Sequence, residues 1–74
     1  METGKLSKSE LEERYPKGTK LKLTAPINDK YTPKNIGDIF TVSYADDYMQ
    51  LHGSWTGGGS MAIIVGQDSF EVVK

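Results

Sequence analysis

The strongest constraint on the fold is a series of short apolar–polar alternations separated by turn-forming residues. From residue 17 onward the chain contains five such runs, with glycines or adjacent aspartates between most of them. Alternation with a period of two is typical of strands that bury one face and expose the other. We therefore expect strands at 19–24, 38–44, 48–55, 60–65 and 69–73.

The same alternation predicts which side chains enter the core. In the first run, for example, Leu21 and Leu23 face inward while Lys20 and Lys22 face solvent. The inward set expected from the first three strands is Leu21, Leu23, Phe40, Val42, Tyr44, Met49, Leu51, Gly53 and Trp55. The fourth run is apolar on both faces, which indicates a buried strand.

A short helix is expected before the first strand, over residues 8–14. Ser7 and Glu10 have the spacing of a capping box, in which each side chain hydrogen-bonds the backbone N–H of the other residue. Pro16 ends the helix, because the residue before a proline avoids helical angles. Leu11 is the side chain expected to hold this helix against the rest of the protein.

The chain is long enough for one domain only. We expect a flexible leader at 1–6, the helix within 7–15 and a β domain at 16–74. A long connection at 25–37 follows the first strand, and long loops in small domains are often functional. Five short strands favour a closed or half-closed small barrel, because closure removes exposed strand edges.

Composition excludes several classes of protein. The 74 residues include no cysteine and one histidine, which excludes disulfide frameworks, thiolate metal sites and two-histidine chemistry. There is no apolar run long enough for a membrane span and no apolar stretch typical of a secretory signal. We therefore expect a cytoplasmic monomer with no metal site and no cofactor.

Short motifs along the chain resemble those of one bacterial family. They are Tyr15-Pro16-Lys17-Gly18-Thr19 followed by Leu21 and Leu23, Phe40-Thr41-Val42, Trp55 before a glycine turn, and Asp68-Ser69-Phe70. Across residues 15–73 the chain resembles the domain of unknown function 4314, found in Gram-positive bacteria, their phages and mobile elements. The resemblance implies an SH3-like barrel but no activity. Gly53 departs from it, since related chains tend to carry a β-branched residue there, and Trp55 or Tyr15 is expected to fill the gap.

The leading functional hypothesis is a non-enzymatic module that binds another protein. Tyr48, Gln50 and His52 alternate along one face of the third expected strand, and Tyr31 lies in the long loop. Exposed aromatic side chains on a rigid sheet are frequent interface anchors, although they are also ordinary on a half-exposed strand. The loop 25–37 is expected to be the adjustable part of this surface.

Two further hypotheses belong to other classes. Nucleic acid could bind a lysine-lined face, for which the candidate residues are Lys17, Lys20, Lys22, Lys30 and Lys34. A net charge of −1 argues against this, since dedicated nucleic-acid binders are usually strongly basic. The mobile-element context implied by the resemblance raises the third hypothesis, a small inhibitor of a host enzyme or defence system.

Enzymatic and metal-binding readings have little support in the sequence. His52 could belong to a Ser–His–Asp arrangement with Asp46 or Asp47, but no motif orders such groups. The glycines at 57–59 lack the lysine and the following helix of a phosphate-binding loop, so a hairpin turn is expected. No calcium-loop spacing is present among the aspartates. We therefore expect that the protein is not an enzyme.

Overall fold

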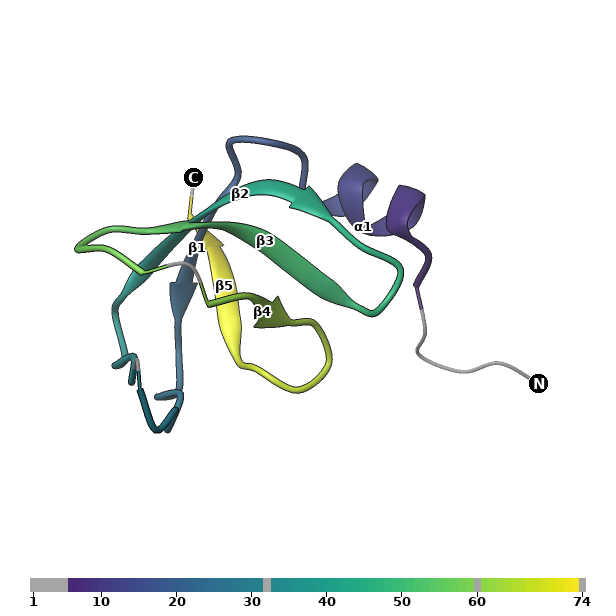
Figure 1. Ribbon diagram of the computed structural model, residues 1–74. Coiled ribbons are helices and arrows are strands. Elements are labelled where there is room, and N and C mark those ends of the chain that lie inside the picture. The colour runs from purple at the N-terminus through teal and green to yellow at the C-terminus, as the bar shows by residue number, and fades with distance from the viewer. Residues whose placement is uncertain (1–5, 32, 60, 74) are drawn as a thin grey trace.

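The computed structural model describes residues 6–31, 33–59 and 61–73 of the chain. Within them the fold is mainly β, with one helix and five strands, as the sequence predicts. The elements are α1 (Lys8–Arg14), β1 (Lys20–Leu23), β2 (Ile39–Ala45), β3 (Gln50–Trp55), β4 (Ile63–Ile64) and β5 (Phe70–Val73). Figure 1 shows α1 beside the end of β2, and the long 25–37 connection descending from the sheet.

All five strands form one antiparallel sheet in the order β4-β3-β2-β1-β5. The sheet curls, so that β5 passes behind β3 and β4 in Figure 1. The hydrogen-bonded ladder does not close in the described residues, and β4 and β5 are its two edges. We expected a closed or half-closed barrel, and the curled sheet with its open ladder corresponds to the half-closed form.

Four strands, β1, β3, β4 and β5, are shorter than expected, and the contacts beside β3 and β4 are specific. β3 begins at Gln50 rather than at 48, because Met49 has a left-handed φ of 62°, which does not fit a strand. Ahead of β4, the carbonyl oxygen of Met61 accepts a hydrogen bond from the Trp55 indole at 2.8 Å. β4 itself has two residues, and residue 60 of the expected strand lies outside the described residues.

The helix begins and ends as predicted. The Ser7 hydroxyl accepts the N–H of Glu10, and the Glu10 carboxylate accepts the N–H of Ser7 at 2.9 Å, which completes the capping box. Leu11 is fully buried. Of the expected leader 1–6, residues 1–5 lie outside the described residues, whereas Leu6 packs against the core.

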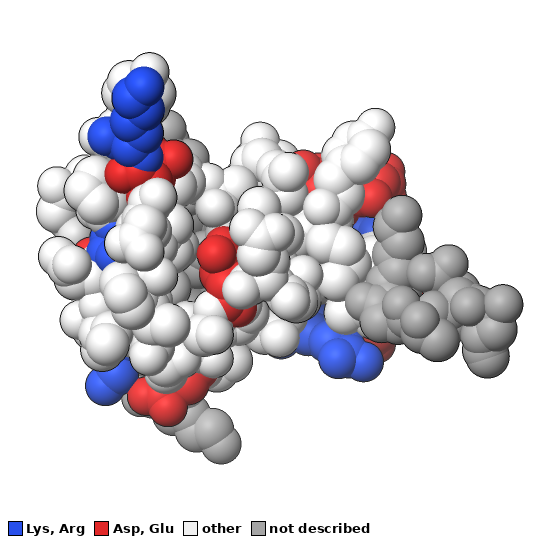
Figure 2. Space-filling model, turned by 90° about the horizontal axis from the view of Figure 1, so that it is seen from below, with Lys and Arg blue, Asp and Glu red and all other residues white. Residues whose placement is uncertain are grey.

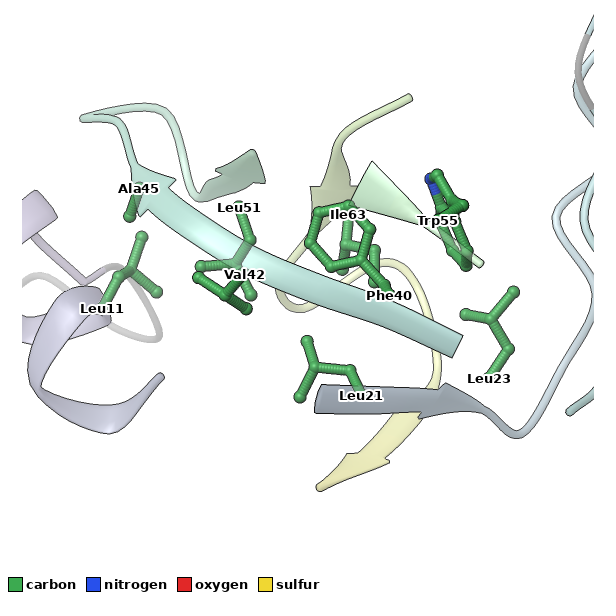
Figure 3. Packing of buried hydrophobic residues seen from close by; sticks show 9 residues of the cluster. All are labelled: Leu11, Leu21, Leu23, Phe40, Val42, Ala45, Leu51, Trp55 and Ile63. Carbon is green, nitrogen blue, oxygen red and sulfur yellow. The ribbon is translucent and has the colours of Figure 1, made fainter. Parts of the chain in front are cut away.

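The core lies inside the curl of the sheet and is closed at one end by α1. Figure 3 shows Leu11 of the helix next to Ala45, and Phe40 near Ile63 and Trp55. The buried residues are Leu11, Leu21, Leu23, Phe40, Val42, Ala45, Leu51, Trp55 and Ile63. The expected orientation of Leu21, Leu23 and Trp55 is thus confirmed.

The prediction that Tyr44 faces the core is wrong. The pairing of β2 with β3 shifts between Val42 and Tyr44, where β2 carries a β-bulge. An extra residue on one strand reverses the sides of all residues after it. Tyr44 is therefore 53% exposed and Ala45 takes the buried position.

The expected gap at Gly53 is also absent. A Cβ on Gly53 would overlap the carbonyl oxygen of Thr41 and lie 3.1 Å from the end of the Phe40 ring. The space beside Gly53 is thus taken by β2 itself and by Phe40, not by Trp55 or Tyr15. Glycine at this position is what allows β2 and β3 to approach so closely.

Candidate functional site

A groove with a volume of about 600 Å³ lies between the start of the long loop and the region of β4. Four segments that are distant in sequence form it: the start of the long loop, the first residue of β3, the β4 region and the turn after β4. The lining residues are Pro26, Ile27, Asn28, Asp29, Gln50, Met61, Ala62, Ile64, Gln67 and Asp68. The volume is within the ~300–1,000 Å³ range of ligand clefts.

The turn between β2 and β3 is organised by the carboxylate of Asp46. One oxygen accepts the backbone N–H of Tyr48 at 2.8 Å and that of Gln50 at 3.2 Å. The other oxygen accepts from Nε2 of His52 at 2.8 Å. The His52 ring also stacks on Tyr44, with centroids 4.8 Å apart and an interplanar angle of 13°. The turn that carries Tyr48 is therefore fixed to the sheet by side-chain contacts.

These contacts change the acidity of Asp46. Partial burial acts to raise the pKa of Asp46, but hydrogen bonds from His52 and from two backbone N–H groups outweigh it. The pKa of Asp46 is consequently held below its usual value of 3.8. A carboxyl whose pKa is lower in the folded state stabilises the fold above its unfolded pKa, and this contribution is lost as the pH falls through the folded pKa.

We expect Asp46→Asn to lower the free energy of unfolding by about 1 kcal/mol at pH 7, because the charged hydrogen bonds are lost. The difference in unfolding free energy from wild type should shrink as the pH falls below 3.8, because the Asp46 carboxyl of the unfolded chain takes up its proton first, and it is lost once the folded carboxyl, whose pKa is lower, is protonated as well. Urea unfolding of both proteins at pH 7 and pH 3 measures this. Asp47→Asn, at the exposed neighbouring position, is the control. If the difference in unfolding free energy between wild type and Asp46→Asn is the same at both pH values, the lowered pKa of Asp46 is contradicted.

The structure distributes the four predicted protein-contact residues over this region. Gln50 lines the groove and His52 is half-buried in the contact with Asp46. Tyr31 and Tyr48 are 82% and 77% exposed. Each tyrosine lies two residues from a groove-lining residue, Tyr31 after Asp29 and Tyr48 before Gln50. Each exposed tyrosine is therefore a near neighbour in sequence of a residue that lines the groove, one on the long loop and one on the β2–β3 turn.

The five candidate lysines do not form a single site. On the outer face of β1, the Nζ of Lys20 donates to the Thr41 hydroxyl at 3.3 Å, and that of Lys22 lies 3.7 Å from the Glu71 carboxylate. Lys17 lies in the exposed turn before β1. Figure 2 shows, on the face seen from below, separate basic and acidic groups on a mostly uncharged surface.

The other two candidate lysines lie in the long loop and contact aromatic rings. The Nζ of Lys30 is 5.6 Å from the centroid of the Tyr31 ring. The Nζ of Lys34 lies 5.0 Å from the Trp55 ring and donates to the carbonyl oxygen of Gly58 at 3.0 Å. Lys34 thus joins the long loop to the glycine turn, which gives it a structural role.

Sequence reasoning missed two parts of the site. The stacking of Tyr44 on His52 depends on a β-bulge, and nothing in the alternation of residues marks the bulge. The groove depends on residues 26–29 meeting residues 61–68, and proximity between a loop and a distant strand has no sequence signal. The long loop was expected to be functional, and its first residues, 26–29, line the groove.

Two kinds of feature are absent from the described parts of the chain. No group of three or more histidine, cysteine or acidic side chains is placed to hold a metal ion. In the same residues, no helix has the length and apolar character needed to cross a membrane.

Comparison with known proteins gives a family but no function. No curated protein and no solved structure matches the chain. One family model, described as a domain of unknown function (DUF4314), matches residues 5–73, which include the helix, all five strands and every groove-lining residue. The chain therefore belongs to the DUF4314 family.

Proposed function

We propose that this protein is a small non-enzymatic module that binds another protein through the groove and two exposed tyrosines. The observation that carries the proposal is a groove of about 600 Å³ together with two strongly exposed tyrosines, Tyr31 and Tyr48. Each of these tyrosines lies two residues in sequence from a residue that lines the groove. Tyrosine is among the residues that contribute most to protein interfaces, because it buries a large area and retains a polar hydroxyl.

The rigidity of the β2–β3 turn supports this proposal. Asp46 fixes the backbone of both Tyr48 and Gln50, and His52 fixes Asp46 in turn. A side chain presented from an ordered turn loses less conformational freedom on binding than one on a mobile loop. The turn is thus suited to present Tyr48 to a partner.

Contacts of the lysines favour a protein partner over nucleic acid. Lys20, Lys22 and Lys34 each have an intramolecular partner, and binding phosphate would compete with it. No continuous basic band crosses the face shown in Figure 2. Nucleic-acid binding through these lysines therefore remains the less favoured hypothesis.

We expect Tyr48→Ala to leave folding unchanged, because the side chain is 77% exposed, and to weaken partner binding at least about fivefold, as loss of an interface anchor does. The measurement is a tagged pull-down from host lysate, with and without nuclease, followed by titration of the captured protein. Ile36→Ala is the matched control, since Ile36 is a 66% exposed apolar residue outside the groove lining.

Two results would contradict the proposal. Equal capture by wild type and by a Tyr31→Ala/Tyr48→Ala double variant would exclude this surface as the binding site. Loss of all captured proteins on nuclease treatment would show that nucleic acid forms the bridge, and the lysine-bearing face of β1 would become the leading site.

A further inference from the structure

We propose that the groove binds a lysine or arginine side chain of the partner, together with apolar residues next to it in the partner's sequence. This inference rests on the proposed protein-binding function and adds the chemistry of the segment that is bound. Its basis is the charge of the groove, the placement of its two carboxylates and the composition of its walls.

Charge within the groove has one sign. Asp29 and Asp68 line it, and no lysine, arginine or histidine is among its described lining residues. Both aspartates are half-buried rather than fully exposed, which reduces the screening of their charge by solvent. A cationic side chain in the groove would therefore be attracted by two carboxylates.

Backbone hydrogen bonds hold both carboxylates in place. Asp29 accepts the N–H of Tyr31 at 2.9 Å, and Asp68 accepts the N–H of Ile64 at 2.8 Å. Each of these bonds uses one lone pair of an oxygen that has two, and leaves the negative charge of the group intact. The acidic groups are thus oriented before any ligand arrives, which lowers the entropic cost of binding.

Lysines of the neighbouring loop have other contacts. Lys30 directly follows Asp29, yet its Nζ lies over the Tyr31 ring. Lys34 is held at the carbonyl oxygen of Gly58 and the Trp55 ring. Neither Lys30 nor Lys34 is among the described residues that line the groove.

The groove walls match a peptide segment better than a free ion. Half of the lining is apolar: Pro26, Ile27, Met61, Ala62 and Ile64. Such walls can pack against the aliphatic stem of a lysine or arginine and against an adjacent apolar side chain. The amides of Asn28, Gln50 and Gln67 supply donors and acceptors for a peptide backbone. A second copy of this chain is a poorer occupant, because Lys20 and Lys22 of its exposed strand already have partners.

Random twelve-residue peptides displayed on phage provide a test that needs no known partner. They are selected on the full chain and, in parallel, on an Asp29→Asn/Asp68→Asn double variant. Each asparagine keeps an oxygen that can accept the backbone N–H but removes the charge, so the fold is preserved, which circular dichroism verifies. Asp47→Asn is the matched control, because it removes one charge outside the groove lining.

Wild type and Asp47→Asn are expected to enrich peptides with lysine or arginine beside leucine, isoleucine or methionine. The double variant should bind those peptides about tenfold more weakly, as expected for the loss of two partly exposed ion pairs. Selection of uncharged or acidic peptides, or equal binding by the double variant, would overturn the basic-segment inference while leaving the protein-binding proposal in place.

Other outcomes bear on different parts of the proposal. Peptides that bind equally well to the Tyr31→Ala/Tyr48→Ala variant would contradict the role of the tyrosines without contradicting the charge argument. No enrichment by wild type would overturn the basic-segment inference. Self-association in sedimentation experiments that disappears in the Asp29→Asn/Asp68→Asn variant would identify a second copy as the occupant and overturn the assignment to a different partner.

Discussion

Replacing Gly53 with alanine is expected to lower the free energy of unfolding by about 3 kcal/mol, at the upper end of the usual cost of overpacking. The new Cβ would overlap the carbonyl oxygen of Thr41, a backbone atom of the neighbouring strand that cannot move without shifting the sheet. A 74-residue domain has a total stability of about 4–11 kcal/mol, so the loss is a large part of it. Urea denaturation followed by circular dichroism measures the change.

Two variants separate backbone overlap from other effects at this position. Ser54→Ala changes the next, exposed residue of β3 and should alter stability by less than about 0.5 kcal/mol. Phe40→Leu in the Gly53→Ala background removes the ring near the new Cβ but leaves the Thr41 carbonyl, so it should not restore stability. A loss below about 1 kcal/mol in Gly53→Ala would contradict the close approach of β2 and β3.

Leu11→Ala is expected to lower the free energy of unfolding by about 3 kcal/mol, within the range for large-to-small changes in a core. Leu11 is the one fully buried residue of α1, and it packs where the helix meets the end of β2 (Figure 3). A helix of seven residues is not stable alone, so its structure depends on this packing. Urea unfolding monitored by helical circular dichroism and by Trp55 fluorescence gives the change.

Controls for this variant lie at the same position and on the exposed side of the helix. Leu11→Met nearly conserves volume and should cost less than about 1.5 kcal/mol, whereas Glu13→Ala should change stability by less than about 0.5 kcal/mol. We expect both probes to report a single transition. A Leu11→Ala change below about 0.5 kcal/mol would mean that the helix is not part of the cooperative unit.

Features that depend on local chemistry were predictable from the sequence. The helix bounds follow from the Ser7–Glu10 capping box and from Pro16, and the structure has both ends as expected. The faces of β1 follow from the alternation of leucine and lysine. Glycines at 57–59 all have positive φ values, as the predicted turn requires. Each of these features involves residues close together in the chain.

Features that depend on contacts between distant segments were not predictable. The bulge in β2 exchanges the sides of the sheet on which Tyr44 and Ala45 lie, and only the pairing of β2 with β3 reveals this bulge. The hydrogen bond from the Trp55 indole to the Met61 carbonyl, just before the two-residue strand β4, is likewise encoded by no periodic pattern. The position of Gly53 against the Thr41 carbonyl likewise depends on how two strands meet.

The candidate site was predicted in part. Exposure of Tyr31 and Tyr48 agrees with the sequence-based hypothesis, and Gln50 lies in the groove. The groove itself and its carboxylates were not predicted. Asp68 was expected only as part of a tight turn, and the structure adds a second role at the groove wall.

The most direct test of the central claim is to map the binding face by NMR, using the full chain labelled with ¹⁵N and the partner identified by pull-down. We predict that the largest amide shifts occur in residues 27–29, in Tyr48 and Gln50, and in residues 61–68. These residues form the groove and the turn that carries one of its tyrosines. Shifts confined to Lys17 and β1, with the groove amides unchanged, would contradict the account and place binding on the lysine-bearing face.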